Sequence, residues 1–171
     1  MVEGITSTGF EAVRTAFEAN LDSGLETGGA VAVWRDGQTV VDLWGGTRDL
    51  ADRLPWQRNT LVNVWSAGKG VVALAVAMLV ERGTLEYDAP VARYWPEFAA
   101  NGKQAITVAQ VMSHQAGLDG LPVELSESQR QAWSPVTAVL AAMKPNWEPG
   151  SRCVYHPETY GYLAGELVRR V

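Results

Sequence analysis

Cysteine is almost absent from this chain of 171 residues, since Cys153 is the single one. One cysteine excludes an intrachain disulfide framework and any zinc or iron–sulfur site built from several cysteines. Histidine is nearly as rare: the chain has two, His114 and His156. Cys153 and His156 stand three residues apart without the further ligands that a metal ion requires. We therefore expect no metal site.

Signatures of cofactor chemistry are also missing. The chain has no H-E-x-x-H pair, no glycine-rich phosphate loop and no G-x-G-x-x-G fingerprint. The G-x-S-x-G pattern of the nucleophile elbow is absent too, because Val64 stands in the place of its first glycine. We therefore expect a protein that works without a bound cofactor.

Positive charge is scarce: 14 basic against 19 acidic residues give a net charge of −5, and no run of Lys and Arg occurs. Such a chain is a poor nucleic-acid binder. The longest apolar run, residues 71–80, is short of the roughly 20 residues that cross a bilayer. The first four residues have neither the basic nor the apolar region of a signal peptide. We expect no nucleic-acid or membrane partner and a cytoplasmic location.

The apolar share of 47% excludes disorder, and this length predicts one domain or part of a larger one, at about 150 residues per domain. Residues 10–21 carry apolar side chains at helical spacing. Residues 30–34 and 39–44 form a predicted β-hairpin around Asp36-Gly37. Further helices are expected at residues 107–113, with Thr107 near the cap, at 135–143 and at 160–171, whereas residues 49–59 and 91–98 are expected to be irregular.

The most distinctive segment is residues 63–83, which is apolar nearly all round. This pattern predicts a central, buried helix that ends at Gly83. The last predicted helix runs to Val171 without a closing glycine, proline or polar tail. We therefore expect a truncated or cleaved chain, with a further C-terminal segment of the same protein as its partner.

An S-x-x-K tetrad, Ser66 to Lys69, opens that helix. A serine hydroxyl needs a base before it can attack a carbonyl. Residues i and i+3 share one face of a helix, so Lys69 is aimed at the Ser66 hydroxyl. The N–H groups at the same helix start suit an oxyanion hole. The tetrad predicts a nucleophile with its base.

The alternative is a capping serine beside a solvated lysine. Two features favour the catalytic interpretation. Lys69 opens a helix with almost no polar face to occupy, and Gly68 and Gly70 imply the close approach of another group, because glycine costs about 1 kcal/mol in a helix.

Tyr155 is the second candidate, because a tyrosine near a lysine can relay protons to a leaving group. An ordinary buried tyrosine is the alternative. We assign Trp65, next to Ser66, and His156, next to Tyr155, to substrate binding. His114 is interpreted as structural, tying a turn by hydrogen bonds rather than acting in catalysis.

The chain resembles the serine β-lactamase-like hydrolases, which include class C β-lactamases, D,D-peptidases and related carboxylesterases. The resemblance rests on four motifs in the family's order: S-A-G-K at 66–69, G-T-L at 83–85 with D-A-P-V at 88–91, V-M-S-H-Q-A-G-L at 111–118, and W-E-P-G at 147–150 ahead of Tyr155. Y-H-P at 155–157 and Y-G-Y-L-A-G-E at 160–166 look closest to the esterase branch, family VIII carboxylesterases.

The resemblance implies an α+β fold, an α/β sandwich with an antiparallel sheet flanked by helices and a mostly helical region. Ser66 would be acylated, Lys69 would be its base or orienting partner, and Tyr155 would relay protons; which of the last two takes the first proton stays open. The substrate would be a small ester of a short acyl chain. Two departures stand out. Later strands of the family's sheet are not in these residues, so residues 1–171 would be the N-terminal portion of a single β-lactamase-like catalytic domain. Pro157 replaces the Asn of class C enzymes.

Two alternatives remain open. One is a β-lactamase or D,D-peptidase of the same fold. The other is a non-catalytic sensor or assembly protein, against which the presence of Ser66, Lys69 and Tyr155 argues, because a binding role needs none of them.

Overall fold

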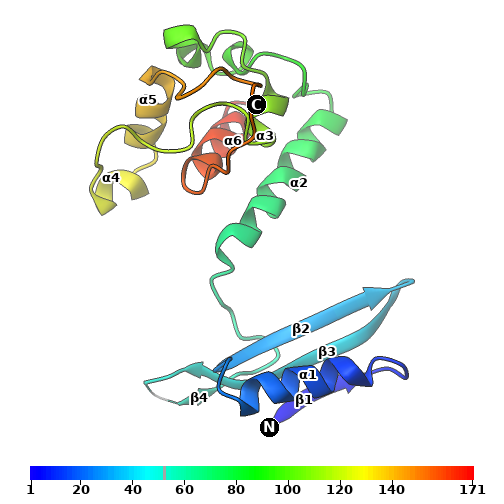
Figure 1. The fold of residues 1–171 in the computed structure, drawn as a ribbon. Coiled ribbons are helices and arrows are strands. Elements are labelled where there is room, and N and C mark those ends of the chain that lie inside the picture. Colours follow the sequence, from blue (N-terminus) through cyan, green and yellow to red (C-terminus); the bar gives the residue numbers. More distant parts are fainter. Residues whose placement is uncertain (52) are drawn as a thin grey trace. The chain divides into compact units, whose positions relative to one another are not determined.

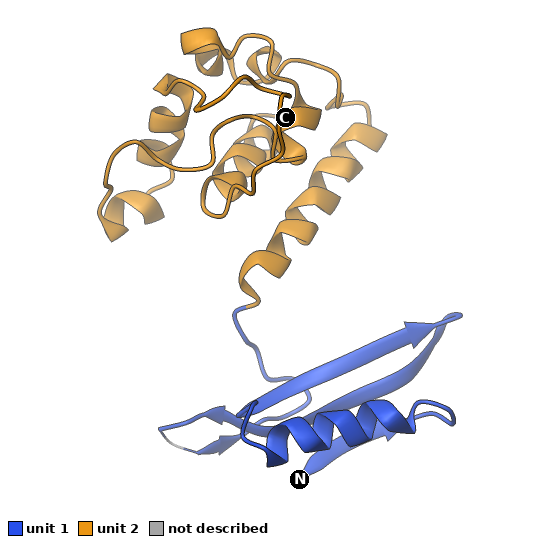
Figure 2. Ribbon diagram, in the orientation of Figure 1, with its two compact units in different colours: residues 1–63 blue, residues 64–171 orange. Residues whose placement is uncertain are grey.

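The computed structural model describes residues 1–51 and 53–171. The chain divides into two compact units, Met1–Asn63 and Val64–Val171 (Figure 2). The first unit holds the strands β1 Val2–Thr6, β2 Gly28–Arg35, β3 Gln38–Asp49 and β4 Leu54–Pro55 and the helix α1 Glu11–Asp22. The second holds the helices α2 Gly68–Glu81, α3 Val108–Met112, α4 Glu127–Gln131, α5 Ser134–Ala142 and α6 Thr159–Arg170, with 3₁₀ segments at Trp65–Ala67, Val91–Arg93 and Pro96–Gly102.

The first unit is an antiparallel sheet in the order β1-β3-β2, with β4 paired to β3, and α1 packs on it (Figure 1). The predicted hairpin is confirmed: Arg35 pairs with Gln38, which leaves Asp36 and Gly37 as a two-residue loop. Both have left-handed backbones, with φ of 50° and 77°, as a turn that matches the strand twist requires. Val41 and Leu43 of β3 are buried, so the middle strand carries the core of this unit.

Two strands of this sheet were not predicted. β1 has five residues and includes Gly4, so it has no clear alternation of apolar and polar side chains. β4 has two residues and lies inside the segment expected to be irregular. Both are held by main-chain pairing to β3 rather than by a pattern of their own side chains.

The second unit is built around a core of large side chains from its helices, its 3₁₀ segments and the loops between them. Its fully buried members include Trp95, Phe98, Leu85, Ile106, Leu118, Leu140, Leu163 and Leu167. The predicted helices at 107–113, 135–143 and 160–171 are present as α3, α5 and α6. Thr107 caps α3 in a reciprocal capping box with Gln110.

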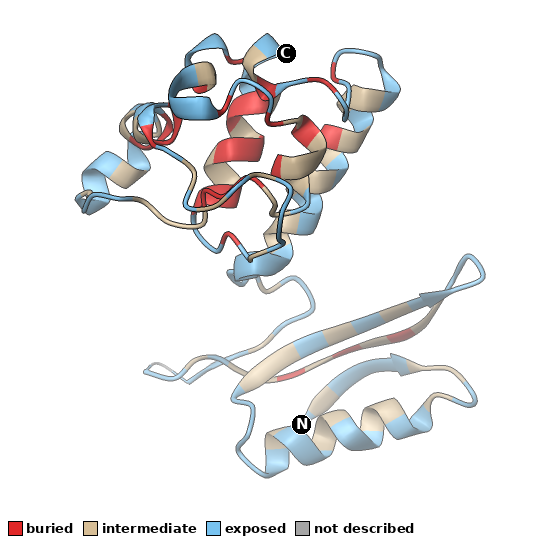
Figure 3. Ribbon diagram, turned by 45° about the horizontal axis from the view of Figure 1, so that its top comes forward, coloured by how far each residue is buried: buried red, intermediate tan, exposed pale blue. Residues whose placement is uncertain are grey.

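The long apolar helix is present as α2, and Gly83 follows its end with φ of +72°. The expectation that α2 is buried all round is wrong for the described residues. Val76 is the one buried residue of the helix, whereas Val71 and Leu74 are 70% and 62% exposed (Figure 3). One face of α2 packs against α6 and the core, and the opposite face, equally apolar, is open.

Candidate active site

Ser66 lies in the 3₁₀ segment Trp65–Ala67, which leads directly into α2. Its side chain therefore stands at the N-terminal end of a 14-residue helix. The residue before it, Trp65, has a left-handed backbone with φ of +48°. A bulky residue seldom adopts that conformation, and such residues gather at functional sites.

Lys69 lies in the first turn of α2, three residues after Ser66. Its ammonium Nζ donates hydrogen bonds to Ser66 Oγ at 3.1 Å and to the carbonyl oxygen of Pro157 at 2.8 Å. Lys69 is half-buried and Ser66 is exposed. The structure thus brings together the two residues that the tetrad predicted to meet, and it adds Pro157 as a second partner of the lysine.

Tyr155 reaches the same place from a loop far along the chain. The Lys69 ammonium lies 5.0 Å from the centre of the Tyr155 ring. Hydrogen bonds with Ser66 and Lys69 hold the pKa of the Tyr155 phenol below its usual value of 10. The ring is half-exposed, so solvent and a substrate can reach the hydroxyl that Ser66 contacts. The arrangement can move a proton between Ser66, Lys69 and Tyr155.

His156 corrects one expectation. It was assigned to substrate binding, but its side chain is fully buried. Its Nε2 accepts the N–H of Leu118 at 3.1 Å, and its Nδ1 lies 2.6 Å from the carbonyl oxygen of Val154. Since both ring nitrogens are already bonded to main chain, His156 has no polar atom left for a substrate. His114, interpreted as structural, does tie the two loops together: its Nδ1 accepts the N–H of His156.

Trp65 remains at the surface beside Ser66, with its side chain 83% exposed. The close approach inferred from Gly68 and Gly70 is not found among the described residues, however. A Cβ added at either glycine would meet no other atom within 4 Å among the described residues, so no close approach by another group explains them here.

The role of Pro157, whose carbonyl oxygen binds Lys69, was not predicted. No sequence signal marks this role, because every residue carries a backbone carbonyl. The two hydrogen bonds of His114 to the loop of Tyr155 were not predicted either. That loop is further linked through Cys153, whose Sγ lies 3.2 Å from the carbonyl oxygen of Ser113.

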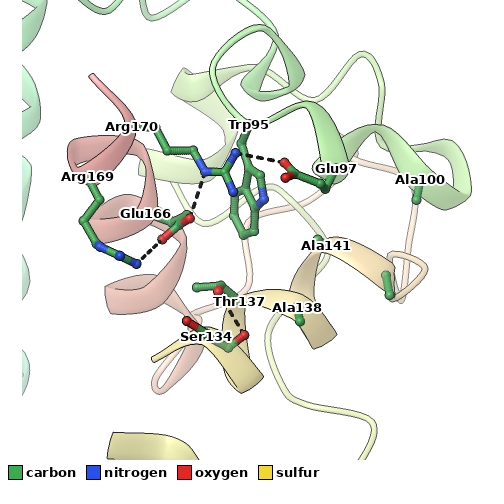
Figure 4. A pocket seen from close by; sticks show the side chains of 11 residues that line it. Trp95, Glu97, Ala100, Ser134, Thr137, Ala138, Ala141, Glu166, Arg169 and Arg170 are labelled. Atoms are coloured by element: carbon green, nitrogen blue, oxygen red, sulfur yellow. Dashed lines mark hydrogen bonds and ion pairs between the residues drawn. The ribbon is translucent and has the colours of Figure 1, made fainter. Parts of the chain in front are cut away.

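A groove of about 470 Å³ lies elsewhere in this unit, between the segment Pro96–Gly102, α5 and α6 (Figure 4). Trp95 and several alanines line it, and its charges are paired internally: Arg170 bridges Glu97 and Glu166, and Arg169 also contacts Glu166. The groove includes none of the predicted site residues. It is therefore not the candidate active site.

Among residues 1–51 and 53–171, no group of three or more His, Cys, Asp or Glu side chains is arranged to hold a metal ion. Within the same residues, no helix combines the length and the apolar character of a membrane span.

A family model described as Beta-lactamase matches residues 13–171. The chain belongs to the Beta-lactamase family. Its similarity to other family members extends over the whole chain: it is 41% identical over 172 aligned residues to "Esterase/beta-lactamase LipL" of Mycobacterium tuberculosis, covering 99% of this chain and 39% of that protein.

Solved structures of Beta-lactamase family relatives agree in fold. A family VIII carboxylesterase matches 99% of this chain with a TM-score of 0.94 and 43% identity. A penicillin-binding protein homolog from Caulobacter crescentus matches 100% of it with a TM-score of 0.95 and 47% identity. The antiparallel sheet with flanking helices and the mostly helical region are thus the β-lactamase-like fold that the motifs implied. The chain spans 46% of each of those two chains, and so less than half of these relatives.

Proposed function

We propose that this chain is the N-terminal portion of a single catalytic domain, and that the full-length protein is a serine hydrolase that cleaves esters of short acyl chains. The observation that carries the proposal is the cluster of Ser66, Lys69 and Tyr155, in which Lys69 Nζ lies 3.1 Å from Ser66 Oγ and 5.0 Å from the centre of the Tyr155 ring. Ser66 and Lys69 also lower the pKa of the Tyr155 phenol. A serine held between two groups that can exchange protons has the arrangement of an activated nucleophile.

Acylation begins when Ser66 Oγ attacks the carbonyl carbon of the ester and its proton passes to the Tyr155 phenolate or the neutral Lys69 amine. The tetrahedral adduct then collapses, the bond to the alcohol oxygen breaks, and the alcohol leaves with that proton. The positive end of the α2 dipole, next to Ser66, favours the negative charge that develops on the carbonyl oxygen. The acyl group remains on Ser66.

In deacylation, water replaces Ser66 as the nucleophile and Ser66 Oγ becomes the leaving group. A water molecule gives its proton to the same base and its oxygen attacks the acyl carbon. The bond to Ser66 Oγ breaks, the proton returns to that oxygen, and the carboxylic acid leaves. One base serves both halves of the cycle, so the proposal needs no metal ion and no cofactor.

Pro157 supports the choice of an ester over a penicillin. In the class C enzymes that the chain resembles, Asn at this position offers a side-chain amide to the antibiotic, whereas proline has neither a side-chain amide nor a backbone N–H. A simple ester has no amide to satisfy, and the exposed ring of Trp65 suits a short acyl chain. LipL, named an esterase and a β-lactamase, and the family VIII carboxylesterase are both similar to this chain, and both support ester hydrolysis.

The test is active-site labelling of the full-length protein with a fluorophosphonate probe. We expect one label on Ser66, and loss of both label and p-nitrophenyl butyrate hydrolysis in Ser66→Ala, by several orders of magnitude because the covalent route is gone. Ser134→Ala is the matched control, since Ser134 is an exposed serine remote in sequence and outside the cluster. Activity of Ser66→Ala within about tenfold of the parent would contradict the proposal. Absence of labelling would favour a non-catalytic sensor or assembly protein.

A further inference from the structure

His114 binds the segment around Tyr155 from both sides. Its carbonyl oxygen accepts the N–H of Val154 at 3.1 Å, and its ring Nδ1 accepts the N–H of His156 at 3.1 Å. Val154 and His156 are the residues immediately before and after Tyr155. One residue therefore holds a backbone N–H on each side of Tyr155.

The ring of His114 also packs directly against the ring of Tyr155. Their centres are 5.1 Å apart, and the buried ring of Tyr160 lies 4.7 Å from His114 on another side. These contacts limit the directions in which Tyr155 can turn. Its hydroxyl is thereby kept where Ser66 and Lys69 lie.

The main chain at His114 is held in an unusual conformation, with φ of +61°. This bend follows the end of α3 and turns both the carbonyl oxygen and the ring towards the loop of Tyr155. A non-glycine residue pays for such a backbone, at a cost of about 1 kcal/mol or more. Asparagine and glycine adopt it more readily than other residues.

The two histidines have opposite tautomers. His114 Nδ1 accepts a hydrogen bond, so the proton of its neutral ring is on Nε2; His156 Nε2 accepts one from Leu118, so its proton is on Nδ1, which donates to Val154. Burial is the main reason why the pKa of each ring lies below its ordinary value, and for His114 the nearby His156 and Lys69 lower it further. Both rings are thus neutral at pH 7. A neutral ring is required, because one nitrogen of each ring accepts a hydrogen bond.

We propose that His114 is a positioning residue. Its ring Nδ1 accepts the N–H of His156 and so holds the Tyr155 hydroxyl against Ser66 and Lys69. This inference rests on the proposed function, in which Tyr155 takes part in proton transfer. His114 itself touches no substrate and carries no proton of the reaction. Its effect is on the geometry and on the ionisation of Tyr155.

The test compares His114→Gly with His114→Asn in the full-length protein. Both residues tolerate the left-handed backbone, but glycine removes the acceptor and the ring, whereas the Asn Oδ1 takes roughly the place of Nδ1. For ester hydrolysis we expect His114→Gly to lower kcat about 10- to 100-fold with little change in KM, as misplaced catalytic groups do. His114→Asn should recover most of that loss. A purely structural role would lower the melting temperature of both variants and leave the kcat of the folded enzyme unchanged.

A second readout does not depend on activity. The ultraviolet difference titration of each protein against its Tyr155→Phe counterpart isolates the Tyr155 phenol. We expect the pKa of Tyr155 to rise towards 10 in His114→Gly and to stay low in His114→Asn. If esters are not hydrolysed at all but this pattern holds, the proposed function fails and the positioning role stands.

Equal pKa values of Tyr155 in the parent and in folded His114→Gly would overturn the positioning role, as would an asparagine variant no better than the glycine variant. If His114→Gly does not fold, nitrogen-15 NMR of the parent's histidine rings decides. A neutral His114 protonated on Nδ1 cannot accept the N–H of His156 and would overturn the proposal; protonation on Nε2 is the expected result.

Discussion

Lys69 Nζ donates a hydrogen bond to the carbonyl oxygen of Pro157 at 2.8 Å, across 88 positions of the sequence. The bond joins the first turn of α2 to the loop that carries Tyr155. A carbonyl oxygen can only accept, so it fixes one N–H of Lys69 and leaves the rest of the amine for Ser66 and Tyr155. This acceptor is a main-chain oxygen, so a substitution at position 157 leaves it in place. The side chain at position 157 can therefore affect the choice of substrate without removing the bond to Lys69.

Pro157→Asn should therefore raise the turnover of a penicillin relative to an ester. A buried substrate amide without a partner costs about 1–3 kcal/mol, or roughly five- to 150-fold in kcat/KM. We expect an increase within that range in the ratio of kcat/KM for a penicillin to that for p-nitrophenyl butyrate. Pro157→Ala is the control, because it restores the backbone N–H without the amide. A parent enzyme that already turns over both substrates equally well would place the protein with the β-lactamases.

The rate of ester hydrolysis should rise with pH through the lowered pKa of Tyr155. Hydrogen bonds with Ser66 and Lys69 favour the phenolate, so the base form becomes populated at a lower pH than in a free tyrosine. Tyr155→Phe should remove this rise and lower kcat about 10²- to 10⁴-fold, the usual contribution of a general base. A profile flat from pH 6 to 9, with chemistry shown to limit the rate, would argue against a Lys or Tyr base.

Stability should fall as the pH drops below about 6.5, the ordinary pKa of histidine. Burial lowers the pKa of His114 and His156 in the folded state. In that range the unfolded chain binds protons that the folded chain does not, so unfolding is favoured as the pH falls towards the lowered values. Melting temperatures measured from pH 7.5 to 5 should decrease, and His114→Asn should flatten the slope. A melting temperature independent of pH in the parent would contradict this account.

Residues 1–171 expressed alone should not hydrolyse esters. α2 presents Val71, Leu74 and Met78 to solvent on one face, and an apolar stripe of this kind normally lies against another part of the protein. We expect the isolated fragment to bind a hydrophobic dye and to show no activity on p-nitrophenyl butyrate. A monomeric fragment that unfolds cooperatively and hydrolyses the ester would show the expectation to be wrong.

The parts of this molecule that were predictable from its sequence depend on local geometry. Asp36-Gly37 determines a turn by itself, and the spacing of Ser66 and Lys69 brings them together on any helix. The burial of α2 was overestimated, because an apolar pattern says which residues prefer to be covered but not what covers them. His156 was misassigned for a related reason: its partners are main-chain groups of Val154 and Leu118, and sequence patterns do not reveal such long-range contacts.

The left-handed backbone of Trp65 has a consequence for protein engineering. A tryptophan in that conformation costs about 1–2 kcal/mol that glycine does not incur. Libraries screened for heat resistance alone should therefore become enriched in Trp65→Gly and Trp65→Asn. These variants would lose the indole ring beside Ser66, so a screen that also selects for catalytic activity should retain tryptophan. The residue ahead of the nucleophile is thus a place where selection for durability and selection for catalysis should diverge.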